Sequence, residues 1–231
     1  MTQTHLITGA GSGIGRAIAR RLSGRGDRLV LVGRDRARAD ELAALFPGSI
    51  GIAADLRQPS SMAAALDEAD VPDALDTVIH GAGIVELGPV GQLSARSWTE
   101  QLTVNLVAAA ELTRLTLPAV RAARGQVLFV NSGAGLTAHA GWSAYAASKH
   151  GLKALADALR AEESEHGVRV TTVYPGRTAT PMQEEVHRQE GRDYDAAAFI
   201  DPESVATTAL AALDLPRDAL VPDVSVRPGP R

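Results

Sequence analysis

Short apolar runs alternate along this chain with longer segments in which apolar residues recur every three or four positions. The runs predict strands, and a helical spacing such as that of Ile14, Ile18 and Leu22 predicts helices. The predicted strands cover residues 5–8, 29–32, 49–54, 76–80, 126–131, 168–174 and 219–221. The predicted helices cover residues 14–22, 36–46, 59–69, 97–120, 143–166 and 202–214, whereas residues 182–200 are polar and less regular.

This alternation of strands and helices predicts an α/β fold built from βαβ units with right-handed crossovers. The fully apolar run 29–32 is typical of a parallel strand buried on both faces. We expect one doubly wound parallel sheet in a Rossmann-type three-layer α/β/α arrangement, with residues 1–231 as a single domain. Ligands of such sheets bind beyond the carboxyl ends of the strands. The residues that follow predicted strand ends, and therefore converge on one rim, are Gly9, Arg34, Asp55, Gly81, Ser132 and Pro175.

Composition and charge narrow the class of protein. The net charge of −4 without a basic run makes nucleic acid a poor candidate partner. The chain has no cysteine, which excludes disulfides, thiol catalysis and cysteine-ligated zinc, and we assign no metal site. The first apolar segment stops at Gly9, too early for a signal peptide or a membrane span. We therefore expect a cytoplasmic protein without a membrane partner.

Glycines gather directly after the first predicted strand, in Thr8-Gly9-Ala10-Gly11-Ser12-Gly13-Ile14-Gly15. A strand, a glycine loop and a helix in this order form the context of a dinucleotide-binding fingerprint. Glycine lets the backbone approach a pyrophosphate closely, and a helix N-terminus presents free N–H groups to it. The pattern predicts a nucleotide site, and the alternative is a glycine-rich turn without a ligand.

The second predicted strand ends at Gly33-Arg34-Asp35. An arginine at this tip suits the 2′-phosphate of NADP, whereas an acidic residue would bind the ribose 2′-hydroxyl of NAD. Arg34 therefore favours NADP(H) as the cofactor, and NAD(H) stays the alternative because Asp35 is adjacent. The other interpretation is a solvated arginine in a charged turn that includes Arg36 and Arg38.

Tyr145 and Lys149 are four positions apart in a predicted helix, so their side chains lie on one face. A nearby ammonium favours the phenolate and lowers the pKa of a tyrosine from about 10. A tyrosine whose pKa is nearer neutrality donates a proton to a carbonyl oxygen or accepts one from an alcohol. The spacing indicates an acid/base pair. The alternative is a half-buried tyrosine and an exposed lysine at the start of a helix.

These motifs occur with others in one order along almost the whole chain. They are Thr8-Gly9-x-x-x-Gly13-x-Gly15, Asp55, Ala82-Gly83, Asn105, Ser132, Tyr145-x-x-x-Lys149 and Pro175-Gly176-x-x-x-Thr180. The set resembles that of the classical short-chain dehydrogenase/reductase family. By this resemblance Tyr145 is the general acid/base and Ser132 hydrogen-bonds the substrate oxygen. Lys149 holds the nicotinamide ribose and lowers the pKa of the tyrosine, and Asn105 anchors a water chain to solvent.

The resemblance also implies a set of cofactor-binding residues. They are Gly9, Ser12, Gly13, Ile14, Gly15, Arg34, Asp55, Leu56, Gly81, Ala82, Gly83, Tyr145, Lys149, Pro175, Gly176, Thr178 and Thr180. Asp55 would meet the adenine, and Thr180 the nicotinamide carboxamide or the pyrophosphate. The chain departs from the family at Gly81, where an asparagine is usual, and at His80, where another often stands. We interpret His80 as a strand-end residue rather than a catalyst.

Substrate-facing candidates lie on both sides of the tyrosine motif. They are Leu136, Thr137, His139 and Trp142 in the first stretch, and Arg177, Met182 and residues to about Phe199 in the second. The charged run 183–192 is typical of a solvated helix face and, as in relatives, of a lid within residues 177–200. Arg177 is a candidate for binding an anionic group of the substrate.

The sequence thus predicts an NADP(H)-dependent oxidoreductase that transfers a hydride between a nicotinamide and a small-molecule carbonyl or secondary alcohol. The alternative from another class is a catalytically silent NADP-binding regulatory or scaffold protein of the same fold. The presence of Tyr145, Lys149, Ser132 and Asn105 disfavours it. A nucleotide-sugar epimerase would need a larger substrate domain. Relatives often pair their long helices, so a homo-oligomer, dimer or tetramer, is expected.

Overall fold

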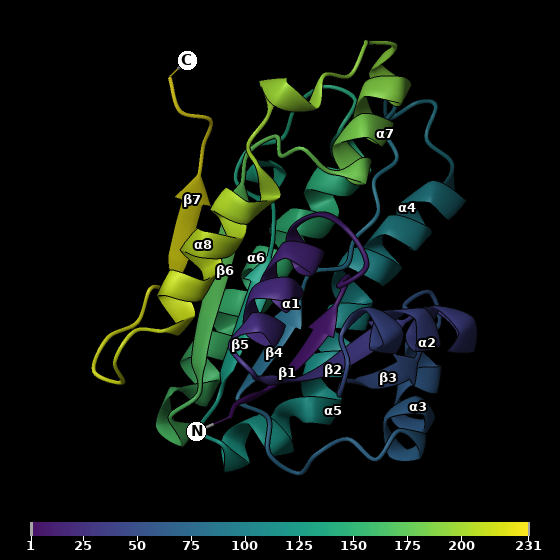
Figure 1. The fold of residues 1–231 in the computed structure, drawn as a ribbon. Coiled ribbons are helices and arrows are strands. Elements are labelled where there is room, and N and C mark those ends of the chain that lie inside the picture. The colour runs from purple at the N-terminus through teal and green to yellow at the C-terminus, as the bar shows by residue number, and fades with distance from the viewer. Residues whose placement is uncertain (1, 231) are drawn as a thin grey trace.

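The computed structural model describes residues 2–230, and its centre is a sheet of seven parallel strands (Figure 1). The strands are β1 (Thr4–Thr8), β2 (Arg28–Gly33), β3 (Ile50–Ala53), β4 (Thr77–His80), β5 (Gln126–Val130), β6 (Arg169–Pro175) and β7 (Asp223–Val226). Their order is β3-β2-β1-β4-β5-β6-β7, so the chain crosses back over β1 between β3 and β4. This confirms the doubly wound sheet and places its switch point between β1 and β4.

Helices cover both faces of this sheet (Figure 1). Within the described residues they are α1 (Gly13–Gly24), α2 (Arg36–Leu45), α3 (Met62–Glu68), α4 (Ala95–Leu102), α5 (Ala108–Ala122), α6 (Ser143–Glu163), α7 (Pro181–Glu190) and α8 (Pro202–Leu213). Neighbouring strand residues point to opposite faces: Ile7 packs with α1 and α8, and Leu6 with α5 and α6. None of the helices within residues 2–230 is long and apolar enough to cross a membrane.

The helix predicted at residues 97–120 is present with an irregular centre. It starts at Ala95, two residues before the predicted start, because Ser94 caps it by accepting a hydrogen bond from the Ser97 N–H at 3.1 Å. Between α4 and α5 the backbone forms a π-helical turn, Thr103–Val107, which contains Asn105. Such turns insert one residue into a helix and often lie at functional sites.

Two C-terminal expectations are corrected. Residues 182–200, expected to be polar and less regular, contain α7 in the stretch whose charges suggested a solvated helix face, and Thr180 caps it by accepting from the Gln183 N–H at 3.2 Å. The strand expected at residues 219–221 is wrong, because β7 begins at Asp223. Exposed and partly buried residues alternate in β7, as in an edge strand that packs on one face, whereas Leu220 is exposed.

His80 ends β4 in the buried centre of the sheet. Its ring stacks on Phe129 with the ring centroids 4.8 Å apart, and its Nε2 lies 2.9 Å from the Thr113 hydroxyl. Burial lowers the pKa of His80 to about 3, so the imidazole is neutral in the folded protein at pH 7. These contacts are those of a packing residue.

We expect His80→Asn to reduce the acid sensitivity of folding. The unfolded chain protonates this histidine at its ordinary pKa of 6.5 and the folded chain only near 3. The contribution of the neutral ring to the free energy of unfolding is therefore fully present above about pH 6.5, and it is lost progressively as the pH falls toward 3. Urea unfolding at about pH 7.5 and about pH 5 should show a smaller loss of stability in the variant than in the wild type. The exposed His139→Asn is the control and should follow the wild type; equal losses in all three proteins would contradict the assignment.

Candidate active site

Two adjoining cavities open at the carboxyl edge of the sheet. The larger, about 510 Å³, is bordered by the glycine loop, residues 81–85, α6 and α7. The second, about 450 Å³, is bordered by the ends of β2 and β3 and by residues 82–84. Every cofactor-binding residue predicted from the sequence lines one of the two. The convergence of strand ends on one rim is therefore confirmed.

The turn between β1 and α1 leaves no room for side chains where it meets the end of β4. Gly9 has a φ of +76°, and a Cβ there would lie 2.6 Å from the Gly81 carbonyl carbon. A Cβ on Gly15 would lie 2.4 Å from the Gly9 carbonyl oxygen. The Ser12 side chain does not cap α1, so no cap from it binds the N–H groups of the first turn, whose residues line the larger cavity. This bare backbone cradle fits the pyrophosphate of a dinucleotide.

Gly81, where the family usually has an asparagine, is tied to β1 by a threonine. The Thr8 hydroxyl accepts from the Gly81 N–H at 3.1 Å and from the Ala82 N–H at 3.2 Å. A Cβ on Gly81 would lie 2.8 Å from the Thr8 carbonyl oxygen. The hydroxyl of β1 therefore fastens the end of β4 without an amide side chain at this position.

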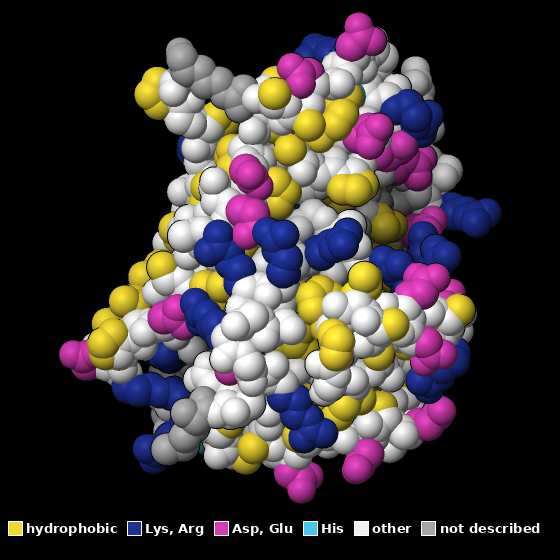
Figure 2. Space-filling view, in the orientation of Figure 1, with side chains coloured by type: hydrophobic (Ala, Val, Ile, Leu, Met, Phe, Trp, Pro, Cys, Tyr) yellow, Lys and Arg dark blue, Asp and Glu magenta, His cyan; other side chains and the backbone are white. Residues whose placement is uncertain are grey.

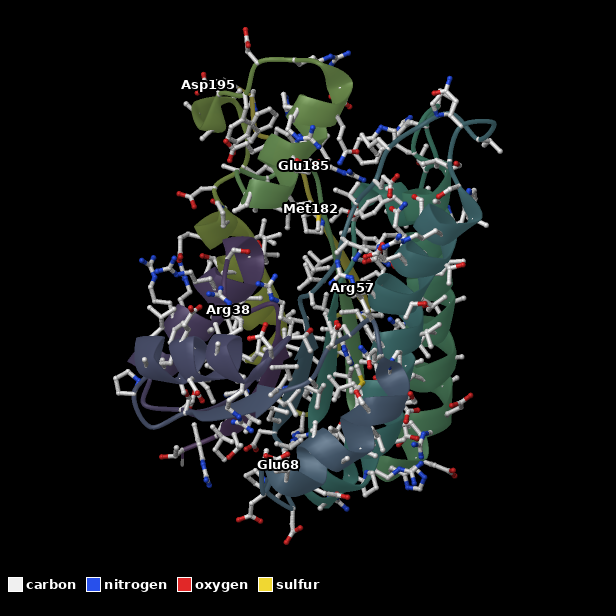
Figure 3. The ribbon with its side chains drawn as sticks, turned by 90° about the vertical axis from the view of Figure 1, so that its right-hand side faces the viewer. Arg38, Arg57, Glu68, Met182, Glu185 and Asp195 are labelled. Atoms are coloured by element: carbon white, nitrogen blue, oxygen red, sulfur yellow. The ribbon has the colours of Figure 1, made fainter. Side chains whose placement is uncertain are left out.

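Two arginines line the second cavity near the start of α2. Arg34 is exposed, and its Nε donates to Asp35 at 3.1 Å. Arg38 donates from Nη2 to the Gly11 carbonyl at 3.4 Å (labelled in Figure 3). The Asp35 carboxylate caps α2 by accepting from the Arg38 N–H at 2.8 Å, and this bond lowers its pKa. The sequence suggested Arg38 only as a charge of the surface turn; its place four residues after Arg34 is the signal for this position.

Tyr145 and Lys149 project from the first turns of α6 into the larger cavity. Both are buried, with exposed fractions of 5% and 3%, which excludes the alternative of an exposed lysine. The Lys149 Nζ lies 5.9 Å from the centre of the tyrosine ring and donates to the Val130 carbonyl at 3.2 Å. Ser132, the second residue after β5, lines the same cavity, and its side chain interacts with the Tyr145 phenol.

The electrostatics of this pair differ from the sequence prediction. Burial raises the pKa of Tyr145 above its ordinary value, and hydrogen bonding with Ser132 offsets only part of that rise. Burial also lowers the pKa of Lys149 to about 8. The pKa of Tyr145 is thus raised where a lowering was expected, because the phenol is deeply buried.

Asn105 joins three elements beneath the site. Its Oδ1 accepts from the Ile84 N–H at 2.8 Å, and its Nδ2 donates to the Ile84 carbonyl at 2.9 Å. The same Nδ2 donates to the Ser148 hydroxyl at 3.0 Å, and that hydroxyl donates to the Tyr145 carbonyl at 2.7 Å. Asn105 thereby fixes α6 relative to the segment that follows β4. Its role in a water chain stays a prediction.

Asn131 is a positioning residue that the sequence analysis did not single out. Its Nδ2 donates to the Lys149 carbonyl at 3.0 Å, and its Oδ1 accepts from the Ser132 N–H at 2.9 Å. A Cβ on Gly135 would lie 2.5 Å from that Oδ1, so the loop needs glycine there. A buried polar residue at the end of an apolar strand was the signal for it.

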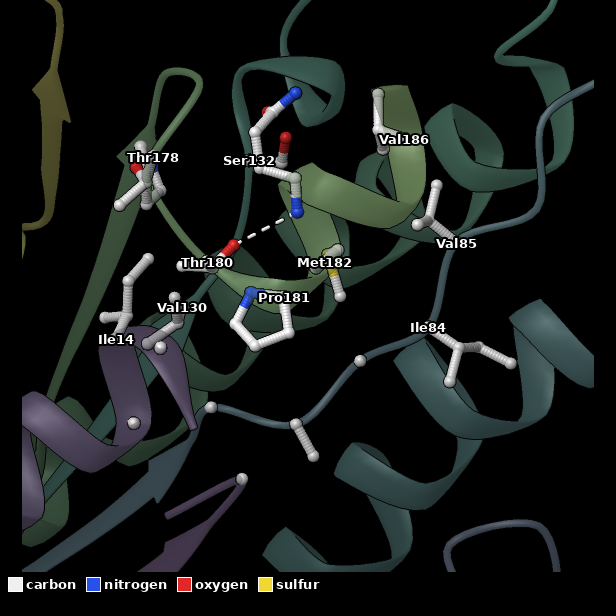
Figure 4. Close-up of a pocket in the computed structure, with 18 of the residues that line it drawn as sticks. Ile14, Ile84, Val85, Val130, Ser132, Thr178, Thr180, Pro181, Met182 and Val186 are labelled. Carbon is white, nitrogen blue, oxygen red and sulfur yellow. Dashed lines mark hydrogen bonds between the residues drawn. The ribbon is translucent and has the colours of Figure 1, made fainter. Parts of the chain in front are cut away.

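The substrate end of the larger cavity contains part of the predicted set. Trp142, Arg177 and Met182 line it, and the Met182 Sδ lies 4.0 Å from the Tyr145 hydroxyl. The candidates that do not line it are Leu136, Thr137, His139 and Phe199. Val186, within the expected range from Met182 to Phe199, also lines it, and apolar walls that were not expected come from Ile84, Val85 and Pro181 (Figure 4). They carry no strand-end or glycine signal, and only the fold brings them together.

Comparison with known proteins identifies the class. The family model for short chain dehydrogenases matches residues 3–191. Oxidoreductase UcpA of Escherichia coli (strain K12) is 32% identical over 221 residues, which cover 93% of this chain and 81% of that protein. The D-beta-hydroxybutyrate dehydrogenase of Rhizobium meliloti (strain 1021) is 33% identical over 192 residues, which cover 80% of this chain and 74% of that protein.

A solved structure agrees with these relatives. The short-chain dehydrogenase from Sphingobium yanoikuyae in complex with NADPH superposes with a TM-score of 0.81 at 30% identity. The match covers 96% of this chain and 87% of that chain. The chain therefore belongs to the short-chain dehydrogenase family and is an oxidoreductase with a Rossmann-type NAD(P)-binding fold.

We expect Gly15→Ala to weaken NADPH binding by at least about tenfold, roughly 1.4 kcal/mol, because the added methyl displaces the Gly9 carbonyl from the cradle. Gly24→Ala in the same helix is the matched control, since a Cβ there meets nothing within 4 Å. Alanine is the better helix former in both positions, so helix propensity does not explain a selective loss. Titration of NADPH fluorescence measures the affinities, and equal affinities of the two variants would contradict the cradle.

Proposed function

We propose that this protein is an NADP(H)-dependent oxidoreductase that interconverts a carbonyl compound and a secondary alcohol, with Tyr145 as the general acid/base. The observation that carries the proposal is the meeting of Tyr145, Lys149 and Ser132 in one cavity beside the glycine cradle. A carbonyl oxygen between the Tyr145 and Ser132 hydroxyls would receive two hydrogen bonds as negative charge develops on it. A bound nicotinamide would supply or accept the hydride.

The protonation states of the buried pair support a proton donor. Because burial raises the pKa of Tyr145, the phenol holds its proton at neutral pH and gives it to the oxygen of a substrate that is being reduced. The Lys149 ammonium is present below about pH 8 and is lost as the pH rises through that value. A positive charge near the phenol stabilises the phenolate that forms when the proton leaves, and the low local polarity strengthens this effect.

The preference for NADP(H) over NAD(H) is supported by the charges of the second cavity. Arg34 and Arg38 line it, whereas the Asp35 carboxylate is occupied as the cap of α2. Guanidinium groups bind phosphate oxygens through charge-assisted hydrogen bonds, and an NAD ribose offers no phosphate there.

A lid formed by residues 177–200, a homo-oligomer and a cytoplasmic location stay predictions from the sequence. A hydroxy acid is the second candidate substrate, because the Rhizobium relative is named a D-beta-hydroxybutyrate dehydrogenase and Arg177 lines the cavity. The catalytically silent alternative is not favoured, since the complete set of candidate catalytic side chains is present.

Tyr145→Phe should lose about 10²- to 10⁴-fold in kcat, because the variant lacks the proton that it transfers. NADPH affinity should stay within about threefold, since the ring that borders the cavity remains. Tyr194→Phe is the matched control: Tyr194 stacks on Phe199 away from the cavity and should keep full activity. Turnover of a ketone panel measures kcat, and wild-type turnover by Tyr145→Phe would remove the acid/base assignment.

Arg34→Ala and Arg38→Ala should each weaken NADPH binding by about tenfold or more, the usual loss for one charge-assisted bond. NADH affinity should change by less than about threefold, because NADH lacks the 2′-phosphate. Arg36→Ala is the matched control between them, since Arg36 pairs with Glu68 at 3.3 Å and does not line the cavity. Calorimetric titration with both cofactors tests this. Equal losses of affinity for NADPH and NADH would show that the two arginines do not bind the 2′-phosphate.

A further inference from the structure

Arg177, the arginine at the substrate end of the larger cavity, is already paired. Arg177 donates through both Nη atoms to Glu190, at 3.1 and 2.7 Å. Its guanidinium carbon also lies 5.9 Å from the centre of the Trp142 ring. Glu190 has a longer contact of 3.9 Å with Arg192, which is mostly exposed and does not line the cavity. A bidentate pair of this kind occupies the guanidinium edge that would otherwise bind a substrate carboxylate.

Among residues 2–230, the one acidic group that lines the cavity is paired with its helix neighbours. Glu185 accepts from Arg188 at 2.7 and 2.5 Å and from Gln189 at 2.6 Å. These bonds lower the pKa of Glu185 to about 2, so it is an anion beside a cation at neutral pH. Figure 2 shows charges of both signs side by side over the α7 end of the molecule. Lys149, the remaining charged residue of the lining, donates to the Val130 carbonyl in the wall of the same cavity.

The rest of this end is apolar. Val85 from the segment after β4 lies opposite Met182 and Val186 from α7, with Ile84 further down the same segment (Figure 4). Figure 3 shows Met182 at the end of α7 nearest the sheet, below Glu185. The contact of 4.0 Å between its sulfur and the Tyr145 hydroxyl puts a thioether beside the place of the reacting carbonyl. The substituents on either side of a substrate carbonyl would therefore contact hydrocarbon side chains and the Met182 sulfur.

Hydrogen bonds hold α7 in this position. The Gln189 side chain accepts from the Leu87 N–H at 2.7 Å and donates to the Val85 carbonyl at 3.3 Å. Together with the Arg177–Glu190 pair, these bonds fasten the C-terminal end of α7 on two sides of the cavity. The apolar wall and the neutralised arginine thus belong to one fixed arrangement.

We propose that the substrate is an uncharged carbonyl compound, or its alcohol, with apolar groups beside the reacting carbon, and that Glu190 excludes anionic substrates by occupying Arg177. The inference rests on the proposed oxidoreductase function of this cavity. An anion that enters loses hydration and finds the Arg177 guanidinium paired with Glu190 and the Lys149 amine bonded to the Val130 carbonyl, whereas an apolar group gains from leaving water.

A matched pair of probes tests the substrate class. Ethyl benzoylformate and benzoylformate share the same ketone and differ in charge. With NADPH, kcat/KM for the ester should exceed that for the acid by at least about tenfold. Glu190→Gln releases Arg177, and kcat/KM for the acid should then rise by about tenfold, through KM, while that for the ester changes by less than about threefold. The matched control is Glu184→Gln, an exposed carboxyl on the same helix, which should leave both values unchanged.

Binding provides a readout that does not depend on turnover. In a Trp98→Phe background, quenching of Trp142 emission reports the affinity of each probe for the protein with NADP⁺, and the ester should bind more tightly than the acid. Two results would overturn the substrate class and leave the proposed oxidoreductase function intact. One is Tyr145-dependent turnover in which kcat/KM is higher for the acid than for the ester. The other is an unchanged kcat/KM for the acid in Glu190→Gln. Tighter ester binding with the expected Glu190→Gln response, but no turnover of either probe, would uphold the selectivity and count against the proposed reaction.

Discussion

The carboxyl edge of this sheet depends on one buried amide. Asn105 is 2% exposed, and a buried amide without partners would be destabilising by about 1–3 kcal/mol for each unpaired group. Its bonds to both backbone groups of Ile84 and to Ser148 therefore fix the distance between the segment after β4 and α6. The π-helical turn places the amide where it reaches both. Because Ser148 also binds the Tyr145 carbonyl, this constraint sets the position of the tyrosine over the cavity.

Burial shifts the pKa values of Tyr145 and Lys149 in opposite directions. It raises the pKa of Tyr145 and lowers that of Lys149, so in both cases it favours the uncharged form. Such an environment penalises isolated charges, but it strengthens the attraction between a phenolate and an ammonium that form beside each other. Before the reaction, Tyr145 and Lys149 therefore each keep their own proton. Their attraction is strongest once the phenol has given up its proton. Asn131 contributes by binding the Lys149 carbonyl and the Ser132 N–H, which keeps the loop and the helix together.

The parts that the sequence predicted well are those whose cause is local. Continuous apolar runs predict buried parallel strands, and Gly9 and Gly15 predict a cradle because only hydrogen fits between their backbones. The missed parts depend on tertiary partners. The start of α7 depends on the Thr180 cap, and its buried face depends on the His187 ring, which packs 5.0 Å from that of Phe199. The pairing of Arg177 with Glu190 crosses from a loop to a helix end, and no spacing rule indicates it.

The two ends of the site are specified by different kinds of atoms. At the cofactor end, backbone groups form the surface, and a Cβ at Gly9 or Gly15 would collide with neighbouring backbone, so this end tolerates little change. At the substrate end, side chains from α7 and from the segment after β4 form the wall. A change at Met182 or Glu190 therefore alters the shape or charge of the space beside Tyr145 and leaves the cradle as it is. Selectivity for the substrate is thus free to vary on a scaffold whose chemistry is fixed by buried backbone contacts.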